Sequence, residues 1–301
     1  MKIVNIIGGL GNQLFQYAFA VALKTHHPGE EVLIDTSHFH TLFFKKYKGR
    51  NLHNGFELDS ILENVILPHA SARQLMKLTY YVPNYLVSRF VRKFFPKRKS
   101  EYIELTDFTF DPNALCMQGN FYYEGYWQTA NYFEGIEEDI KRAFKFKPLD
   151  SENLQWIAQM QSQESVSIHV RRGDYINNVG FGGICDLDYY VAAIEYVFSK
   201  VNNPVFYIFS NDIKWCEENI IPLLNGAKCK LVNHNRGKDS YKDMELMSFC
   251  KVNIIANSSF SWWGAFLNKN DNPIVIAPYK WNNYFNEVDT YLDKWIKINI
   301  K

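Results

Sequence analysis

The second half of the chain alternates short apolar runs with helix-like stretches, and this alternation limits the fold most strongly. The apolar runs are SVSIHV, VFYIFS, CKLVN, VNIIAN and PIVIA, and stretches such as DLDYYVAAIEYVFSKV lie between them. Repeated strand–helix units form a parallel sheet with helices on both faces, and ligands bind at the carboxyl ends of its strands. Polar segments follow these strands: RRGDY, SND, NHNRG, SSFSWWG and PYKW. The sequence therefore predicts a binding site along one edge of the sheet.

The first half begins in the same way, with strand KIVNII, loop GGLGNQ, helix LFQYAFAVALK and strand EVLID. Residues 40 to 150 are less regular and rich in aromatic residues. The polar stretch 146–155 is the best candidate for a linker. A chain of 301 residues, 47% of them apolar, can bury two cores of ordinary size. We therefore predict an α/β fold with two domains, 1–150 and 151–301, that face each other across a cleft.

Charge and cysteine content exclude several classes of protein. The 33 basic and 32 acidic residues leave a net charge of +1, which gives no field for binding nucleic acid. The five cysteines are odd in number and lack a C-x-x-C spacing, so neither a disulfide framework nor a zinc site is indicated. KIVNII reads as a strand, and no run of 18 apolar residues occurs. We therefore expect no signal peptide, no transmembrane helix and a cytoplasmic protein.

One segment, residues 64–100, breaks this charge balance, because it has no acid and eight basic residues. These are Arg73, Lys77, Arg89, Arg92, Lys93, Lys97, Arg98 and Lys99. Within it, YLVSRFVRKFF places Leu86, Phe90 and Phe94 at i, i+4 spacing, which predicts a basic amphipathic helix. Two interpretations stay open. Either the helix packs on its own domain with a solvated basic face, or it makes weak contact with the anionic inner face of the cytoplasmic membrane.

The glycine loop of the first half resembles a dinucleotide-binding turn, because Asp35 ends the next strand where a ribose-binding acid would lie. However, Leu14 occupies the third glycine position, which must be small for close packing of helix on sheet, so NAD is disfavoured. We expect instead that the loop offers backbone N–H groups and side-chain amides to a ligand, with a plain turn as the alternative. These groups belong to Gly8, Gly9, Gly11, Asn12 and Gln13.

Two adjacent arginines follow the first strand of the second half, in SIHVRRGDYI. A guanidinium is planar, permanently charged and bidentate, so it suits a phosphate oxygen at a strand end better than lysine does. We therefore expect Arg171 and Arg172 to bind an anion. A salt bridge from this pair to Asp174 is the alternative.

A second anion site is expected near the end of the chain, in ANSSFSWWGAFLN. Here Asn257, Ser258 and Ser259 lead from a strand into a helix, and the first N–H groups of a helix bind phosphate. Serine and asparagine are also ordinary helix caps, so plain N-capping is the alternative.

Five motifs give the chain a resemblance to a known family over nearly its whole length. GGLGNQLFQYAFA, YYEGYWQTANYF, HVRRGDY, FSNDIKW and NSSFSWWGAFLN look like the ordered motif set of the alpha-1,2-fucosyltransferases in family 11 of the glycosyltransferases. The resemblance implies a GT-B-type fold of two Rossmann-like lobes, an N-terminal acceptor-side lobe and a C-terminal lobe that binds GDP-fucose. It implies inverting, metal-free transfer of L-fucose to the 2-hydroxyl of a terminal beta-galactose in an oligosaccharide or surface glycan, which in bacteria is often lipid-linked. No cofactor is implied.

The resemblance also implies roles for individual residues. Arg171 is expected to be the main partner of the departing β-phosphate in place of a metal, and Asn12 to lie near the reacting sugar. The donor-binding residues implied are Gly9, Gly11, Gln13, His169, Arg172, Asn211, Asp212, Asn257, Ser258, Ser259, Phe260 and Ser261. The residues expected to bind the acceptor are Tyr126, Trp127 and Gln128.

Inversion requires that the acceptor hydroxyl lose its proton, and Asp174 is the carboxylate nearest to the donor motif. It is our candidate general base. A structural tether for the arginine turn, and a late proton transfer to a phosphate oxygen, stay open as alternatives.

Two rival functions also stay open. The D-x-D spacing of Asp186 and Asp188 resembles the metal site of other nucleotide-sugar transferases, although aspartate at a helix start is also a good cap. A non-catalytic protein that binds sugar nucleotides is the second alternative. The sequence does not determine the oligomeric state.

Overall fold

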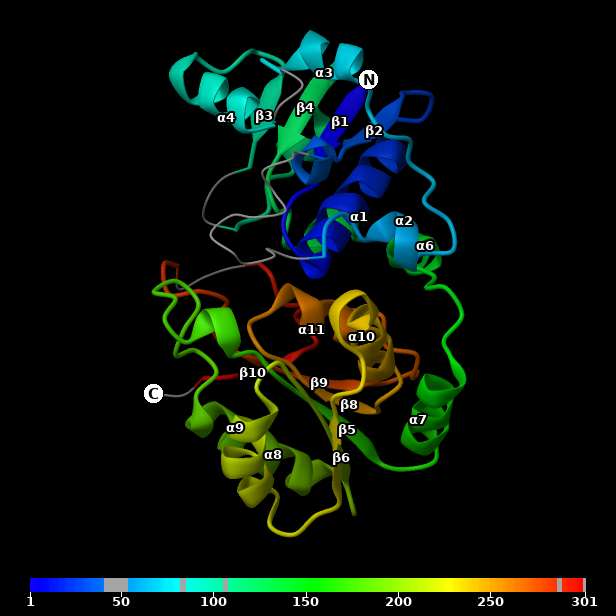
Figure 1. The fold of residues 1–301 in the computed structure, drawn as a ribbon, viewed down its shortest axis with the longest axis vertical. Helices are drawn as coiled ribbons and strands as arrows, with labels where there is room; N and C mark the ends of the chain where they lie inside the picture. Colours follow the sequence, from blue (N-terminus) through cyan, green and yellow to red (C-terminus); the bar gives the residue numbers. More distant parts are fainter. Residues whose placement is uncertain (41–53, 82–84, 105–107, 286–288, 300–301) are drawn as a thin grey trace. The chain divides into compact units, whose positions relative to one another are not determined.

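The computed structural model describes residues 1–40, 54–81, 85–104, 108–285 and 289–299 (Figure 1). The chain divides into two compact units, Met1–Lys147 and Pro148–Lys301. The boundary falls within the polar stretch 146–155. Asp150, which we placed at the end of the first domain, accepts a hydrogen bond from the backbone N–H of Asn153 and caps the first helix of the second unit.

Unit 1 contains a four-stranded sheet in the order β2-β1-β4-β3, with every neighbouring pair parallel. Its strands are β1 (Lys2–Asn5), β2 (Val32–Asp35), β3 (Glu101–Ile103) and β4 (Phe121–Glu124). Its α-helices are α1 (Leu10–His26), α2 (Leu58–Ile61), α3 (Ala72–Leu78), α4 (Tyr85–Phe94), α5 (Asn113–Cys116) and α6 (Glu137–Ala143). Two 3₁₀ helices are η1 (Ser37–His40) and η3 (Ala130–Phe133).

Helix α1 is the central helix of unit 1, and it packs against β1 and β2. Its apolar residues from Leu14 to Leu23 are buried, which explains why this segment reads as apolar on nearly all sides. Lys24 and His26 lie in its last turn, where positive charge favours the helix dipole. The opposite face of the sheet is covered by Leu75 and Leu78 of α3.

Unit 2 contains a six-stranded sheet in the order β10-β9-β8-β5-β6-β7, again with every neighbouring pair parallel. Its strands are β5 (Ser165–Val170), β6 (Val205–Ser210), β7 (Cys229–Val232), β8 (Val252–Ile254), β9 (Ile274–Pro278) and β10 (Ile296–Ile298). Its α-helices are α7 (Ser151–Gln161), α8 (Leu187–Lys200), α9 (Ile213–Asn219), α10 (Tyr241–Ser248) and α11 (Ser259–Phe266). Its 3₁₀ helices are η4 (Gly173–Tyr175), η5 (Ile221–Leu224) and η6 (Gly237–Asp239).

Strand β5 shows how its sequence divides between the two faces of this sheet. Every residue of β5 is buried. Val166 and its i+2 and i+4 neighbours join the core that includes α8. Because side chains alternate along a strand, Ser167 and His169 face the other side. There, Ser167 accepts a hydrogen bond from Asn253 Nδ2 (2.7 Å), and His169 lies against Phe260 of α11. Strand β5 is therefore buried on both faces, and its polar side chains Ser167 and His169 lie on the face that α11 covers.

The predicted GT-B-type fold class is confirmed as two α/β units that each contain a parallel sheet. The cleft between the lobes, and the acceptor and donor roles of the lobes, stay predictions. In the parts of the chain that the structure describes, no helix is both long and apolar enough to span a bilayer. The side chains of Leu86, Arg89 and Arg92, which entered the predicted amphipathic helix, lie outside the described residues.

Candidate functional site

The chain reverses its direction across the sheet of unit 2 between β5 and β8. After β5 the chain adds β6 and β7 on one side, and it then returns to place β8 on the other side of β5. A crevice forms at such a switch point beyond the carboxyl ends of the two strands, and ligands bind there. β5 ends at the two arginines, and β8 leads to the serine-rich start of α11. The topology therefore brings two of the predicted anion-binding segments together.

Arg172 is held by residues that follow the neighbouring strand β6. Its Nε donates to Asp212 Oδ2 (3.1 Å), and its guanidinium lies 4.1 Å from the ring centre of Trp215. Its backbone N–H donates to Asn211 Oδ1 (3.0 Å), and Asp212 also caps α9 by accepting from the N–H of Trp215 (3.2 Å). These contacts favour a role for Arg172 in fixing the turn over the expected role in binding the donor. Asn211 and Asp212, expected at the donor, are committed to the same turn.

Gly173 lies in the same turn, and its backbone has a φ of +26°. A Cβ at this position would collide with Nδ2 of Asn211. Only glycine therefore allows Asn211 to lie so close to the turn that follows β5.

Arg171 keeps part of its hydrogen-bonding capacity unused. Its Nη2 donates to Asp174 Oδ1 (2.8 Å), and its guanidinium lies 5.5 Å from the ring centre of Tyr175. Its Nε is buried and has no hydrogen-bond partner among the residues that the structure describes. A buried donor without a partner costs about 1–3 kcal/mol, so an anion that accepted from Nε would recover this energy. The open position at Nε therefore suits an anion bound at the switch point.

His169 lies below this turn, on the same face of the sheet as α11. Its ring centre is 5.7 Å from that of Phe260, and its Nδ1 lacks a hydrogen-bond partner within the described part of the chain. Burial, reinforced by the positive charge of Arg171, lowers the pKa of His169 to about 3. The imidazole is therefore neutral near pH 7, and one of its nitrogens can accept a hydrogen bond.

At the start of α11, the side chains divide between internal and outer positions. Asn257 is buried, and its Nδ2 donates to the carbonyls of Phe181 (3.1 Å) and Trp281 (3.2 Å). Ser261 is buried and donates within its own turn, to the carbonyl of Ser258 (3.3 Å). Ser258 is also buried, and the Tyr175 hydroxyl donates to the carbonyl of the preceding Asn257 (3.3 Å). These three side chains are buried, and their contact with the donor stays a prediction.

Ser259 and Phe260 are half-buried and occupy the first turn of α11. Ser258 is the N-cap, but its side chain does not cap the helix. The first N–H groups of a helix have no partner within the helix and carry partial positive charge. The backbone of this turn, rather than the serine hydroxyls, is therefore the expected contact for phosphate.

In unit 1 the chain also reverses direction, between β1 and β4. The glycine loop follows β1, with Gly8 at a φ of +82° and Gly9 as the N-cap of α1. Gln13 is buried, and its Nε2 donates to the carbonyls of Gly8 (3.0 Å) and Gly55 (2.8 Å). Its Oε1 accepts from the N–H of Glu57 (2.9 Å). Gln13, expected to bind the donor, is thus a structural link, and Gly11 is buried inside α1.

Asn12 and Gln128 meet at this switch point of unit 1. Gln128 Nε2 donates to Asn12 Oδ1 at 2.8 Å. The two residues are 116 positions apart, and they were predicted separately, one for the reacting sugar and one for the acceptor. Tyr126 is exposed beside them. The structure therefore brings these three predicted residues to one edge of the sheet.

Trp127 is different, because its ring is completely buried. It stacks on Phe19 of α1 with ring centres 4.0 Å apart and planes at 6°. Its backbone has a positive φ of 55°, and Glu104 Oε1 accepts from its N–H (2.8 Å). Trp127, which we expected to bind the acceptor, belongs to the core. An aromatic residue inside a motif is as consistent with packing as with sugar binding.

Two further sequence interpretations can be compared with the geometry. Asp186 is the N-cap of α8 and accepts from the N–H of Tyr189 (3.0 Å), which is the capping role weighed against metal binding. Asp35, the acid that would bind ribose in a dinucleotide site, accepts hydrogen bonds from Tyr122 OH (2.8 Å) and from the N–H of Ser37. Its carboxylate is therefore already bonded within the protein. No cluster of three or more potential metal ligands occurs within the described ranges.

Several residues of the site were not predicted. Tyr175 lies beside Arg171, and Trp215 lies beside Arg172. Both stand inside quoted motifs, but the motifs alone do not indicate these contacts. Glu104 holds the backbone of residues 126 and 127, and nothing in the sequence marks it.

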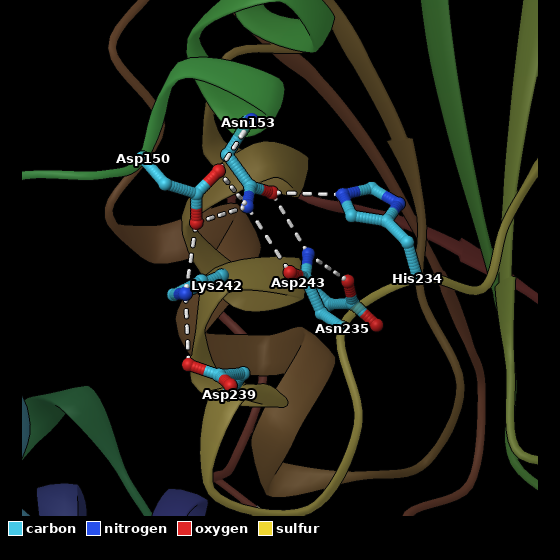
Figure 2. A network of polar contacts seen from close by, with 7 residues as sticks. All are labelled: Asp150, Asn153, His234, Asn235, Asp239, Lys242 and Asp243. Atoms are coloured by element: carbon cyan, nitrogen blue, oxygen red, sulfur yellow. Dashed lines mark hydrogen bonds and ion pairs between the residues drawn. The ribbon is translucent and has the colours of Figure 1, made fainter.

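A polar network also joins α7, the loop after β7, and α10 (Figure 2). Its members are Asp150, Asn153, His234, Asn235, Asp239, Lys242 and Asp243.

Comparisons with known proteins agree with this architecture. The sequence model of Glycosyl transferase family 11 matches residues 1–299. An alpha-1,2-colitosyltransferase of Escherichia coli is 33% identical over 98% of this chain and 98% of its own length. The O-antigen biosynthesis glycosyltransferase WbnK of Escherichia coli is 31% identical over 97% of this chain and 98% of its own length. Galactoside alpha-(1,2)-fucosyltransferase 2 of Sus scrofa is 26% identical over 99% of this chain and 80% of its own length. The chain therefore belongs to glycosyl transferase family 11.

Proposed function

We propose that this glycosyltransferase moves L-fucose from GDP-fucose to the 2-hydroxyl of a terminal beta-galactose, in an oligosaccharide or surface glycan, with inversion at the transferred sugar. The observation that carries the proposal is the state of Arg171. Its Nε is buried without a partner in the described structure, at the switch point where the start of α11 also lies. Relatives include transferases whose names specify alpha-1,2 linkage and galactoside acceptors, which supports the same linkage here.

The proposed mechanism places charge stabilisation in unit 2. As the bond between fucose and GDP breaks, negative charge grows on the β-phosphate. Arg171 would stabilise this negative charge through two N–H groups. The first turn of α11 would add the backbone N–H groups of Ser259 and Phe260. Donors fixed in advance at developing charge are typically worth ~10²–10³ in rate each. No metal ion is part of this proposal, because Arg171 and the backbone N–H groups would stabilise the charge of the phosphate in its place.

The acceptor side of the proposal rests on unit 1. Asn12 and Gln128 would orient a sugar hydroxyl through amide groups, with Tyr126 exposed beside them as a surface for the acceptor. Asp174 is proposed as the general base. Its side chain is 60% exposed, so an acceptor hydroxyl can reach the carboxylate without displacing packed groups.

A second donor has support from one observation, the 33% identity to a colitosyltransferase. Colitose is fucose without its 3-hydroxyl. A site that hydrogen-bonds this hydroxyl rejects the deoxy sugar strongly, whereas a site that leaves it solvated accepts both. Comparing the two donors therefore identifies the natural one.

The test is to incubate the purified chain with lactose and either GDP-fucose or GDP-colitose, and to read the product mass and linkage. We expect 2'-fucosyllactose with GDP-fucose and at least ~10-fold lower kcat/KM with GDP-colitose. Arg171→Ala should lower kcat at least ~10²-fold, and Arg171→Lys should recover little, because lysine lacks the planar fork. GDP binding without any transfer to a panel of galactosides would instead support the non-catalytic alternative.

A further inference from the structure

Helix α4 of unit 1 exposes its apolar side. Phe90 and Phe94 are 63% and 65% exposed, and their ring centres are 4.5 Å apart. Val87, three residues before Phe90, is 46% exposed, whereas Ser88 is only 2% exposed. A helix that packed its apolar stripe on its own domain would show the opposite pattern. For these side chains, the interpretation as an ordinary packed surface helix is not supported.

The turn after α4 continues this apolar surface and fixes it to α3. Phe95 is exposed, and its ring centre lies 5.5 Å from that of Tyr80. Arg98 lies over Tyr80 at 4.4 Å from the ring centre, and its Nη1 donates to the carbonyl of Met76 (3.2 Å). Arg98, one of the eight basic residues of this segment, is therefore largely structural. The side chain of Met76 itself is exposed beside it.

Exposed cations lie on the same helices and on the turn after α4. They are Arg73 and Lys77 on α3, Lys93 on α4, and Lys97 and Lys99 on the turn that follows. No acidic residue occurs between Asn64 and Ser100. The nearest carboxylate in this turn, that of Glu101, accepts from the backbone N–H of Arg98 (2.8 Å). We call this the α3–α4 surface, defined by Arg73, Met76, Lys77, Val87, Phe90, Lys93, Phe94, Phe95, Lys97 and Lys99. Figure 1 shows the two helices within unit 1.

We infer that the α3–α4 surface docks on an anionic lipid bilayer. Exposed phenylalanines beside lysines are the composition of helices that lie in a membrane interface, where the rings enter the acyl boundary and the ammonium groups meet lipid phosphates. The absence of acids in this sequence segment matches a negatively charged, extended partner. An inference of this kind goes beyond sugar transfer, and it does not depend on which sugar is transferred.

The strength of the attachment depends on two contributions, that of the cations and that of the phenylalanine rings. Each cation near an anionic surface contributes about fivefold in affinity at low salt, and salt screens this attraction over about 10 Å. Two or three phenylalanine rings at the interface are fewer than a stable anchor needs, so binding should be reversible.

The experiment is co-sedimentation of the full chain with vesicles of phosphatidylcholine, alone or with about one third phosphatidylglycerol, at about 50 mM and about 500 mM salt. We expect binding to the anionic vesicles at low salt, at least ~10-fold weaker binding at high salt, and little binding to neutral vesicles. Quenching of a fluorophore at residue 91 by brominated lipid would report the depth of the helix.

Two variants test the two contributions, each with a matched control. K93Q/K97Q/K99Q should lower affinity for anionic vesicles at least ~10-fold, whereas K24Q/K228Q/K294Q, with the same change in charge at exposed positions elsewhere, should not. F90S/F94S should lower affinity similarly, whereas I66S/L154S, at other exposed apolar positions, should not. Thermal unfolding checks that each variant is folded.

Three outcomes would overturn the inference. One is no binding to anionic vesicles at low salt. Another is equal loss in the surface variants and their controls, which would indicate a general charge effect. The last is a dimer in sedimentation velocity that F90S/F94S dissociates, because a second copy of the chain would then cover the surface. Failure of sugar transfer would affect none of these readouts.

Discussion

The Nη2 atom of Arg171 and the Oδ1 atom of Asp174 lie 2.8 Å apart, one turn after the central strand of unit 2. The carboxylate proposed as the general base is thus also the ion-pair partner of the arginine proposed to bind phosphate. The two roles differ in energy. An exposed ion pair of this kind contributes only about 0.2–1 kcal/mol, whereas a general base contributes ~10²–10⁴ in rate.

Asp174→Asn separates these roles. If the carboxylate is the base, kcat should fall at least ~10²-fold, while the Kd for GDP should change less than ~5-fold, because asparagine still accepts a hydrogen bond from Arg171. Isothermal titration with GDP and steady-state kinetics measure the two quantities. If Kd and kcat deteriorate together, Asp174 acts as a tether for Arg171, and the base must be sought elsewhere.

A second prediction concerns the clamp on Arg172. Arg172→Lys removes both the contact with Trp215 and the directed hydrogen bond to Asp212, so it should destabilise the protein by about 1–3 kcal/mol. The measurement is urea unfolding. The matched control is Arg236→Lys, at an exposed arginine whose Nε donates only to a nearby loop carbonyl, that of Asn233, in the described contacts. If Arg172→Lys instead keeps full stability and loses GDP affinity, Arg172 binds phosphate directly.

A third prediction distinguishes helix capping from metal binding at Asp186. Asparagine caps a helix about as well as aspartate, so Asp186→Asn should change neither stability nor activity appreciably, whereas Asp186→Ala should cost about 1 kcal/mol. Activity should also survive EDTA. Thermal unfolding and initial rates measure these effects. Stimulation of metal-stripped protein by Mn²⁺ of ~10-fold or more, together with an inactive Asp186→Asn, would revive the metal-dependent mechanism.

The sequence predicted the parallel sheets well, because buried strands and amphipathic helices leave a strong periodic pattern. It did not indicate which members of a motif have side chains that are bonded within the protein. Gln13 and Asn257 stand in motifs that the resemblance assigns to the donor, and here their side chains satisfy backbone carbonyls of distant segments. Such pairings depend on the tertiary fold, and no local pattern reports them. Trp127 shows the same limit for an aromatic residue.

The apolar side of α4 illustrates the reverse case. The spacing of Phe90 and Phe94 predicted an amphipathic helix from sequence alone, but periodicity cannot tell which side of a helix faces solvent. Only the burial of Ser88 and the exposure of the two rings decide this question.

The last prediction concerns the polar network of unit 2 (Figure 2). Burial raises the pKa of Asp243 to about 7, and the hydrogen bond that Asn235 Nδ2 donates to Asp243 Oδ1 (2.8 Å) opposes this rise only in part. The neighbouring cation, Lys242, is held by Asp150 Oδ2 (2.9 Å) and Asp239 Oδ1 (2.8 Å). The folded protein therefore favours protonated Asp243, whereas the unfolded chain has an ordinary pKa near ~3.9.

The sign of the effect on stability follows from this difference. Below about pH 4 both states are protonated, and the folded state is not penalised. As the pH rises from ~4 through 7, the unfolded chain loses its proton first, so stability is lost across this window. Asp243→Asn keeps an acceptor for Asn235 without the charge. It should therefore raise the unfolding temperature at pH 8 by about 2 °C or more, and the gain should vanish near pH 4.

The matched control is Asp239→Asn, in the same network. Asp239 is an exposed carboxylate whose charge stabilises Lys242, so its removal should lower the unfolding temperature at pH 8 rather than raise it. Differential scanning calorimetry between pH 4 and pH 8 measures both variants against the unaltered chain, which cancels other groups that titrate in this window, such as Glu245 with its pKa raised by burial to about 7. A gain for Asp243→Asn that is the same at every pH would show that packing, rather than the buried charge, limits the stability of this network.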